Sequence, residues 1–323
     1  MMILTKNTIF YQPLFGKALK LIVFFILVFH STSLFAQSPE NYDEDGNLIL
    51  KNRKGFATGL YLGSYFPNSY SATLYDGYGF DFDGNKNTYE NSWMYEKIIN
   101  QYGGGYGQPD YIGEALGVPP EDWNFDESDM PANMRYKTAF LIGFTGRYSV
   151  DAKNAVLINV NAAILKAVGN FTITTRPLPG STQVNNSIKQ FNISGEEQRL
   201  HFQAGYQHLF GKGETFNVFM EGGLHATLAK FDKNEIEIEN LRINLFEPYY
   251  DQNGGTTFFP GAKPVSLGFG AFAGLGVNIR TTGKWMLQLL YNVTLENIKI
   301  TYDPKLTLNN ALGLRAYYSL SKQ

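Results

Sequence analysis

The amino-acid sequence predicts an all-β fold, a transmembrane antiparallel up-and-down β-barrel of eight strands with a long first extracellular loop. Three observations predict this fold class. Apolar residues alternate with glycine and polar residues over long runs, the connections between these runs alternate between short and long, and the N-terminal segment is typical of a secreted chain.

The clearest alternation lies in residues 264–295. One parity is apolar from Val265 to Ile279, whereas the other carries mostly glycine and polar residues. After a break at 281–284, a second alternating run begins at Trp285. Each run is about 15 residues long, against about 5–6 for an average strand. A strand with lipid on one face and a polar lumen on the other requires this pattern over about 9–11 residues per crossing.

Further stretches alternate in the same way and bring the total to eight strands: residues 55–66, 134–150, 155–174, 195–210, 215–230 and 306–320. The connections after the second, fourth and sixth strands are tight turns, and those after the first, third and fifth are long. Outer-membrane barrels have short periplasmic turns and longer outside loops, so both chain ends are expected in the periplasm. Residues 235–245 also alternate, and they either extend the fifth strand above the membrane or form a hairpin that raises the strand count to ten.

Aromatic residues on the apolar parity mark the predicted periplasmic ends of the strands. Ring side chains favour the membrane–water interface, and a soluble core would not sort them by strand end. These residues are Phe56, Tyr148, Phe210, Phe216, Trp285 and Tyr318.

The composition excludes several classes of protein. The chain has 323 residues, no cysteine, a formal net charge of -2 and an aromatic share of 15%. The absence of a basic excess argues against nucleic-acid binding. The absence of cysteine excludes disulfides and thiol catalysis.

Residues 1–36 have the features of a secretory signal peptide. Three lysines precede the apolar run at 21–29, and a small-x-small site ends at Ala36. The run is too short for the roughly 20 residues of a membrane helix. We therefore expect cleavage near Ala36, a periplasmic segment at 37–54, a barrel at 55–323 with an extracellular insertion at 68–133, and a place in the outer membrane of a Gram-negative bacterium.

The architecture resembles that of the small eight-stranded outer-membrane barrels of the OmpA barrel domain, OmpX and PorT-like type. The resemblance covers residues 55–323, and residues 311–320 are similar to the family's assembly signal, with Gly313 and Tyr318 at its spacing. The last strand departs from that signal because it does not end on phenylalanine. PorT-like members imply a role in protein secretion. No functional residue is carried over, because no position matches residue by residue.

Charged residues fall on the inward parity of the predicted strands. The interior of an eight-stranded barrel is wide enough only for side chains, and unpaired buried charges are costly. We therefore predict structural ion pairing in the lumen, with a narrow gated pore for small solutes as the alternative. The predicted polar network comprises Arg147, Glu221, Arg280, Glu296 and Arg315, together with His201 and His225.

The two inward histidines raise the question of a metal site. His201 and His225 lie on neighbouring strands of one hairpin, where two imidazoles could bind Zn²⁺ or sense pH. No third ligand is identifiable from the sequence, and a zinc site needs more than two protein ligands. The sequence therefore predicts neither a metal nor a cofactor.

A lipid-modifying barrel enzyme is a further alternative. Such an enzyme needs a lipid-facing His–Ser pair, and the histidine on the outward parity, His208, has no serine partner on its hairpin. We therefore predict a non-enzymatic protein without catalytic residues.

The insertion at 68–133 is more than a plain barrel needs. It holds twelve acidic residues against Lys86 and Lys97, with many aromatic residues. A disordered acidic loop would be poor in aromatic residues, so we expect a folded cap with a short helix at 92–101. Exposed rings suit a protein or glycan partner, and the alternative is that they pack against each other over the barrel mouth. The candidate partner-binding residues are Tyr75, Tyr78, Phe80, Phe82, Trp93, Tyr95, Trp123 and Phe125.

Together these features predict a non-enzymatic barrel that contacts outer-membrane lipid. Its extracellular loops are expected to bind a protein or glycan partner, as a surface adhesin or as a subunit of an outer-membrane complex.

Overall fold

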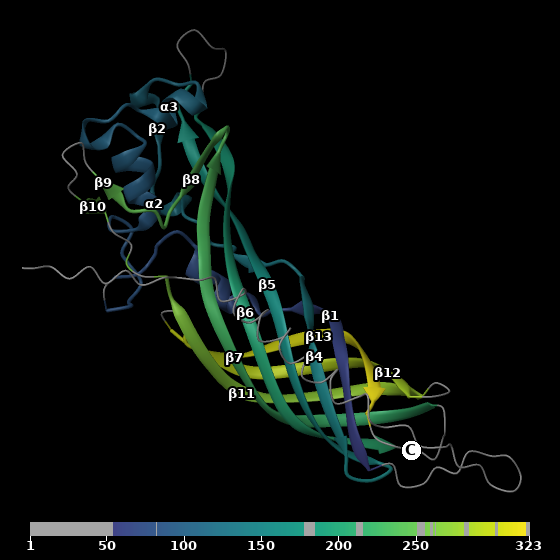
Figure 1. Ribbon diagram of the computed structural model, residues 1–323. Helices are drawn as coiled ribbons and strands as arrows, with labels where there is room; N and C mark the ends of the chain where they lie inside the picture. The colour runs from purple at the N-terminus through teal and green to yellow at the C-terminus, as the bar shows by residue number, and fades with distance from the viewer. Residues whose placement is uncertain are drawn as a thin grey trace, which may run out of the picture.

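Eight antiparallel strands close into a ring in the computed structural model, which describes residues 54–81, 83–177, 185–210, 216–250, 256–258, 261, 263–280, 284–300 and 303–320. The ring strands are β1 (Gly55–Phe66), β4 (Ala139–Ser149), β5 (Asn154–Thr175), β6 (Ser187–Phe210), β7 (Phe216–Ile238), β11 (Val265–Arg280), β12 (Trp285–Ile298) and β13 (Leu306–Ser319). Each pairs with the next along the chain, and β13 pairs with β1 (Figure 1). The predicted fold class is confirmed. The predicted signal peptide and residues 37–53 lie outside the described residues.

The ring closes through continuous registers between strands that are distant in sequence. β1 pairs with β13 from Ala57 to Phe66 of β1. β7 pairs with β11 from Val265 to Ile279 of β11. Residues 239–264 separate these two strands in the sequence. A closed ring leaves no unpaired strand edge within it.

The outer face of the ring carries an apolar belt. Large apolar side chains are exposed on every ring strand, while the opposite parity of the same strands is buried. This is the arrangement of a transmembrane barrel, in which lipid covers the outer face. One example from each strand is given by Leu60, Ile142, Ile158, Phe202, Leu224, Phe269, Leu289 and Leu312.

The aromatic girdle lies at the end of the ring where the tight turns are found, here called the turn end. Phe56 is paired with Tyr148 across β1 and β4. The rings of Trp285 and Tyr318 meet edge-on, with their centroids 5.2 Å apart. The prediction that these rings face outward is confirmed by the exposure of Tyr148, Phe210, Phe216 and Trp285.

Three ring strands continue far beyond the others at the opposite end. β5, β6 and β7 have 22, 24 and 23 residues, whereas β1 has 12 and β4 has 11. β7 turns back into β8 (Leu241–Asn244), which pairs with it outside the ring. Residues 235–238 therefore extend the fifth strand, and residues 241–244 form a hairpin with it that lies outside the ring, which has eight strands rather than ten.

The predicted bound at 174 agrees with the end of β5 at Thr175, whereas the predicted bounds at 195 and 230 fall short of β6, which begins at Ser187, and of β7, which ends at Ile238. The reason lies in a change of pattern, because the inward side chains become apolar there. Phe171, Ile193 and Phe231 point inward and are buried, whereas their ring counterparts, such as Asn159 and Gln203, are polar. The apolar residues thus change faces along one strand, which breaks the alternation that marked the ring.

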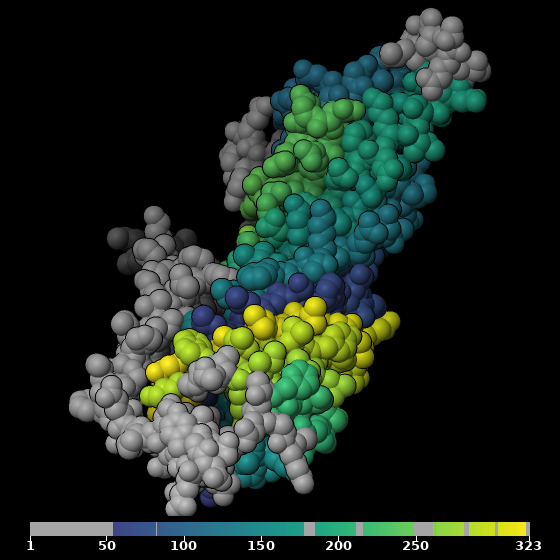
Figure 2. Space-filling model, turned by 90° about the vertical axis from the view of Figure 1, so that its right-hand side faces the viewer, coloured from purple at the N-terminus to yellow at the C-terminus, as the bar shows by residue number. Residues whose placement is uncertain are grey.

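The chain between β1 and β4, residues 67–138, folds into a cap against the extension. Its elements are the 3-10 helix Ser69–Tyr75, α2 (Trp93–Tyr95) continuing into the π-helix Glu96–Gln101, the 3-10 helix Gly105–Gly107, α3 (Tyr111–Leu116), the 3-10 helices Pro120–Asp122 and Glu127–Asp129, and the short strands β2 (Trp123–Asn124) and β3 (Arg135–Tyr136). The helix predicted at 92–101 is confirmed. β2 and β3 pair with β5, and β9 (Tyr249–Tyr250) pairs with β10 (Thr256–Phe258). Figure 2 shows the cap and extension standing as an arm beyond the ring.

A continuous apolar core joins the cap to the extension. Cap residues Leu74, Trp93 and Ile98 are buried in it together with Phe231 and Ile236 of β7. A second, smaller core lies inside the ring itself. No helix among the described residues is long and apolar enough to cross a membrane.

Candidate functional site

The lumen contains a fully buried, bidentate ion pair. Arg315 on β13 donates through both terminal guanidinium nitrogens to the two carboxylate oxygens of Glu221 on β7, at 2.7 Å each. Both side chains have no exposed area. Two parallel charge-assisted hydrogen bonds are the geometry that best compensates a buried pair.

A glutamine extends this pair toward the turn end. Gln207 donates to Glu221 at 2.9 Å, and its carbonyl oxygen accepts from Nε of Arg147 at 3.0 Å. Arg147 also donates to Ser149 at 2.6 Å. The structure thus brings three of the predicted network residues, Arg147, Glu221 and Arg315, into one chain of hydrogen bonds. Arg280 is half-buried at the turn end of β11.

A second buried ion pair lies between the lumen and the cap. Arg199 donates to Glu197 at 2.5 Å, and both side chains are buried. Arg199 also donates to Ser71 at 2.9 Å, and the hydroxyls of Tyr75 and Tyr136 donate to Glu197 at 3.0 and 2.7 Å. This pair therefore anchors the base of the cap. This pair was not predicted, although both residues continue the inward parity of the strand that carries His201.

The two inward histidines meet a carboxylate from a third strand. The hydroxyl oxygen of Thr227 lies 2.9 Å from Nδ1 of His201 and 2.8 Å from Nε2 of His225. The same hydroxyl donates to Oε2 of Glu296 at 2.5 Å. Glu296 comes from β12, which is not a neighbour of β6 or β7 in the sheet, so its position could not be read from the hairpin that holds the histidines. The structure therefore supplies the third group that the sequence analysis could not name.

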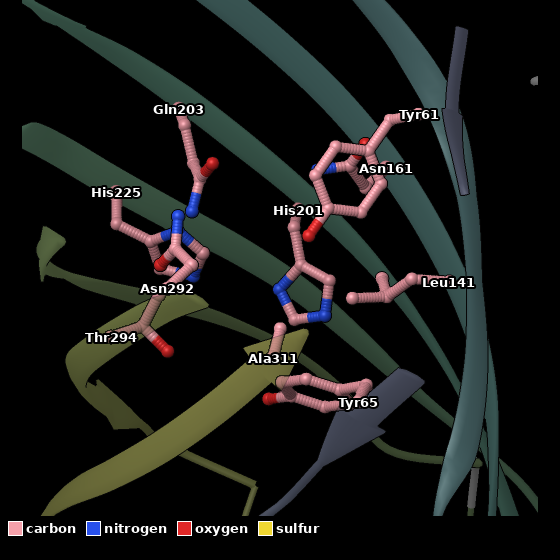
Figure 3. Close-up of a pocket in the computed structure, with 10 residues that line it drawn as sticks. All are labelled: Tyr61, Tyr65, Leu141, Asn161, His201, Gln203, His225, Asn292, Thr294 and Ala311. Atoms are coloured by element: carbon pink, nitrogen blue, oxygen red, sulfur yellow. The ribbon is translucent and has the colours of Figure 1, made fainter. Parts of the chain in front are cut away.

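A small cavity adjoins these histidines, as Figure 3 shows. Its volume is about 20 Å³, which is room for one water-sized group and too little for an organic ligand. The cavity is lined by Tyr61, Tyr65, Leu141, Asn161, His201, Gln203, His225, Asn292, Thr294 and Ala311.

Inward aromatic rings fill the lumen toward the turn end. A Cβ on Gly205 would lie 2.6 Å from the ring of Phe272, and a Cβ on Gly276 would lie 2.5 Å from the ring of Phe219. Glycine at these two positions makes room for the rings. The lumen described here is therefore a packed interior, as a barrel of this strand number requires.

The cap buries several of the rings that were expected to contact a partner. Tyr75, Trp93 and Phe125 are at most 2% exposed. Tyr75 stacks on Phe231, and Trp93 meets Phe246 edge-on. For these three residues the prediction of a partner contact is wrong, because they form the core between the cap and the extension.

The other candidate rings remain partly accessible. Tyr78, Phe80, Tyr95 and Trp123 are half-buried, and Phe82 lies outside the described residues. Two rings that the sequence analysis did not select are more exposed, Tyr106 at 54% and Tyr111 at 42%. The glycines at 103–105 and 107 that surround Tyr106 are the signal that could have marked this exposed turn.

The surface of the cap is acidic. Its exposed acidic residues are Asp81, Asp83, Glu90, Glu114, Glu121, Asp126 and Glu127. Two lysines of the cap are held by the fold: Lys86 donates to Asp76 at 2.6 Å, and Lys97 donates to Gln101 and to the backbone carbonyl of Glu247 at 2.8 and 2.9 Å. The exposed cations Arg135 and Lys137 lie where the cap joins β4. Burial raises the pKa of the Asp76 carboxyl, and burial lowers the pKa of Lys97 to about 8.

Comparison with known proteins finds solved outer-membrane barrels of low sequence identity. Neisserial surface protein A (NspA) matches at 8% identity with a TM-score of 0.38, over 81% of this chain and 95% of that chain. Ail, the attachment invasion locus protein of Yersinia pestis, matches at 10% identity with a TM-score of 0.31, over 82% and 99%. The outer membrane protein OprG from Pseudomonas aeruginosa matches at 9% identity with a TM-score of 0.33, over 82% and 94%. No family model and no curated protein matches the sequence.

Proposed function

We propose that this chain is an outer-membrane barrel whose cap binds a partner at the cell surface, as an adhesin or as a subunit of an outer-membrane complex. The ring holds the chain in the membrane with its turn end toward the periplasm. The cap then stands outside, on the extension of β5, β6 and β7, where it meets a protein or glycan.

The observation that carries this proposal is that the cap is a folded body that shares an apolar core with the extension. A connection that only closes the sheet needs a few residues, whereas the cap occupies residues 67–138 and buries Trp93 and Ile98 against the extension. Ordering so much chain costs conformational entropy. A fixed outer surface with exposed rings is the property that such ordering provides for binding.

The exposed acidic residues of the cap indicate which kind of partner surface it would bind. Seven acidic residues are exposed on the cap, and complementary potentials steer association. We therefore favour a protein with a basic surface. Ail has been solved with the heparin analogue sucrose octasulfate, but a sulfated glycan would be repelled by the acidic surface of this cap.

Charge reversal on the cap tests the proposal while leaving its core intact. Glu90, Glu114 and Glu121 are exposed. The triple variant Glu90→Lys, Glu114→Lys, Glu121→Lys should lose most of the protein that co-purifies with the full chain from crosslinked outer membranes in mild detergent. The matched variant with glutamine at the three positions changes the net charge by half as much and should show an intermediate loss of the co-purifying protein.

Binding should also weaken as salt concentration rises, because exposed charges are screened. An unchanged set of co-purifying proteins in the lysine variant would refute a role for this surface. A partner that is lost after deglycosylation of the sample, and not after charge reversal, would identify a glycan instead.

A further inference from the structure

We infer that His201, His225 and Glu296 form a binding site for a divalent transition-metal ion of the Zn²⁺ class inside the barrel. One potential ligand atom from each residue lies within 4.8 Å of the other two, and all three side chains are buried. Two imidazoles and one carboxylate are an established ligand set for Zn²⁺, which leaves a fourth position open. This inference concerns the lumen and is independent of the function proposed for the cap.

The hydrogen bonds of Thr227 show that the three groups already point to one place. The Thr227 hydroxyl oxygen lies within 2.9 Å of a nitrogen of each histidine and within 2.5 Å of the carboxylate of Glu296. Zinc–ligand distances are about 2.0–2.2 Å, so each ligand would move inward by less than about 1 Å once the hydroxyl turns aside. The ligands come from β6, β7 and β12, and the backbone of the closed ring fixes their relative positions.

The pairing of the buried carboxylates favours a cation beside Glu296. Two buried carboxylates, Glu197 and Glu221, are paired with arginines. The ion-pair partner of Glu296 is instead His225, at 3.1 Å, which is charged only if protonated. A buried carboxylate needs a compensating charge. A divalent ion would supply it while both imidazoles stay neutral, as metal ligation requires.

A hydrogen bond from Asn309 orients the carboxylate of Glu296. Nδ2 of Asn309 donates to Oε1 of Glu296 at 2.8 Å, and the side chain of Asn309 is buried. This hydrogen bond leaves Oε2 facing the histidines. Groups that hold one oxygen of a ligating carboxylate in this way are typical of metal sites and raise their affinity.

Unpaired polar atoms belong to residues that line the cavity beside these ligands. Nε2 of His201 and Nδ1 of His225 are buried and have no hydrogen-bond partner among the described residues. The side-chain oxygens of Asn161 and Asn292 are also buried without a hydrogen-bond partner among the described residues. All four side chains line the small cavity (Figure 3). Buried polar atoms without partners are costly and call for an explanation. The two unpaired nitrogens are on the opposite sides of the rings from Thr227, so they stay free of the ion, and a water molecule in the cavity would give them and the two amide oxygens partners.

The experiment is a metal titration of the mature full-length chain, refolded in detergent without an affinity tag. Zn²⁺ is followed by calorimetry, and Co²⁺ by its visible absorption bands, at neutral pH. We expect one ion per chain and an unfolding temperature that rises with Zn²⁺ concentration, since an ion that binds only the native state stabilises it.

Variants locate the ion. His201→Gln, His225→Gln and Glu296→Gln should each lose saturable binding, and Asn309→Ala should weaken it by about 10–100-fold. His208→Gln is the matched control, because His208 lies on the same strand at the turn end, hydrogen-bonded to Asn154. This variant should bind as the wild type does.

The wild-type titration decides the matter even if a lumen variant fails to fold. No saturable binding at one ion per chain would overturn the inference and leave a closed hydrogen-bond cluster. Binding that survives in the His201→Gln, His225→Gln double variant would overturn it as well, because the ion would then lie elsewhere.

Discussion

At the scale of single residues, the interior of this barrel depends on paired charges. Arg315 and Glu221 form two 2.7 Å hydrogen bonds with no exposed area on either side chain. Gln207 joins Glu221 to Arg147, so that the pair belongs to a longer chain of donors and acceptors. A charge buried in this way is stable only while its partner is present.

Removal of one partner should therefore cost much more than removal of both. Arg315→Ala leaves Glu221 buried without its cation and should lower the free energy of unfolding by about 3–5 kcal/mol. Denaturant unfolding in lipid vesicles measures this value. The double variant Arg315→Met, Glu221→Leu should recover most of the loss, because a packed apolar pair is often as stable as a buried ion pair. A single variant as stable as the wild type would contradict this account.

At the scale of elements, β5, β6 and β7 each serve two environments. Their inward side chains are polar inside the ring, as in Asn159 and Gln203, and apolar beneath the cap, as in Phe171 and Phe231. The change occurs near the ion pair of Glu197 and Arg199. Glu197 accepts a hydrogen bond from Tyr75 of the cap, and Arg199 donates one to Ser71 of the cap. The cap and the extension thus share one core, and the core inside the ring is a separate one.

The cap should become more stable as pH rises above about 8. Burial lowers the pKa of Lys97 to about 8 from 10.5, with Glu247 and Glu96 opposing the shift. Between these values the unfolded chain binds more protons than the folded chain, so stability increases with pH. Deprotonation of tyrosines in the unfolded chain opposes this trend above about pH 10.

Thermal unfolding of the cap, followed by the fluorescence of buried Trp93, measures this dependence between about pH 7.5 and 9.5. Lys97→Met should abolish the rise in unfolding temperature over this interval. Lys86→Met is the control, since Lys86 is a partly exposed lysine of the same cap and should leave the rise in place. A rise that persists in Lys97→Met would assign it to another group.

At the scale of the whole molecule, a closed ring separates an apolar outside from a packed polar inside. The ring strands pair without interruption from β1 round to β13, and large side chains such as Arg315, Tyr61 and Phe219 are fully buried within it. The interior of an eight-stranded ring has no room for both these side chains and a water column.

The purified protein should therefore give no steady conductance in planar bilayers. A porin reconstituted in the same bilayers serves as the positive control. A stable open level in single-channel recordings would show that the lumen opens, and it would favour the alternative of a narrow pore for small solutes.

The ring was predictable because its signal is local. Alternation from Val265 to Ile279 follows from the backbone of a strand with two different faces, and it needs no knowledge of neighbouring strands. The bounds of β1 agree with the prediction, and the girdle residues Tyr148 and Trp285 are exposed where they were expected. The extension was harder to recognise because its apolar face is turned toward the cap.

The candidate site was predictable only in part. The inward parity of His201, His225 and Glu296 is a local property and could be read from the sequence. Their convergence on the hydroxyl of Thr227 depends on the curvature of the ring, which brings side chains of β12 to those of β6 and β7, although β12 is not a neighbour of either strand in the sheet.

The sequence by itself thus determined the fold class and the face on which the side chains of the ring lie, because these follow from residue periodicity along one strand. The structure decided between eight and ten ring strands, because the hairpin of β7 and β8 lies outside the ring. The tertiary structure alone decided which inward charges are partners and which cap rings are buried. Tyr75 and Trp93 carry no mark in the sequence that separates them from the exposed Tyr106. Their burial results from packing against Phe231 and Phe246, residues that only the folded chain brings to them.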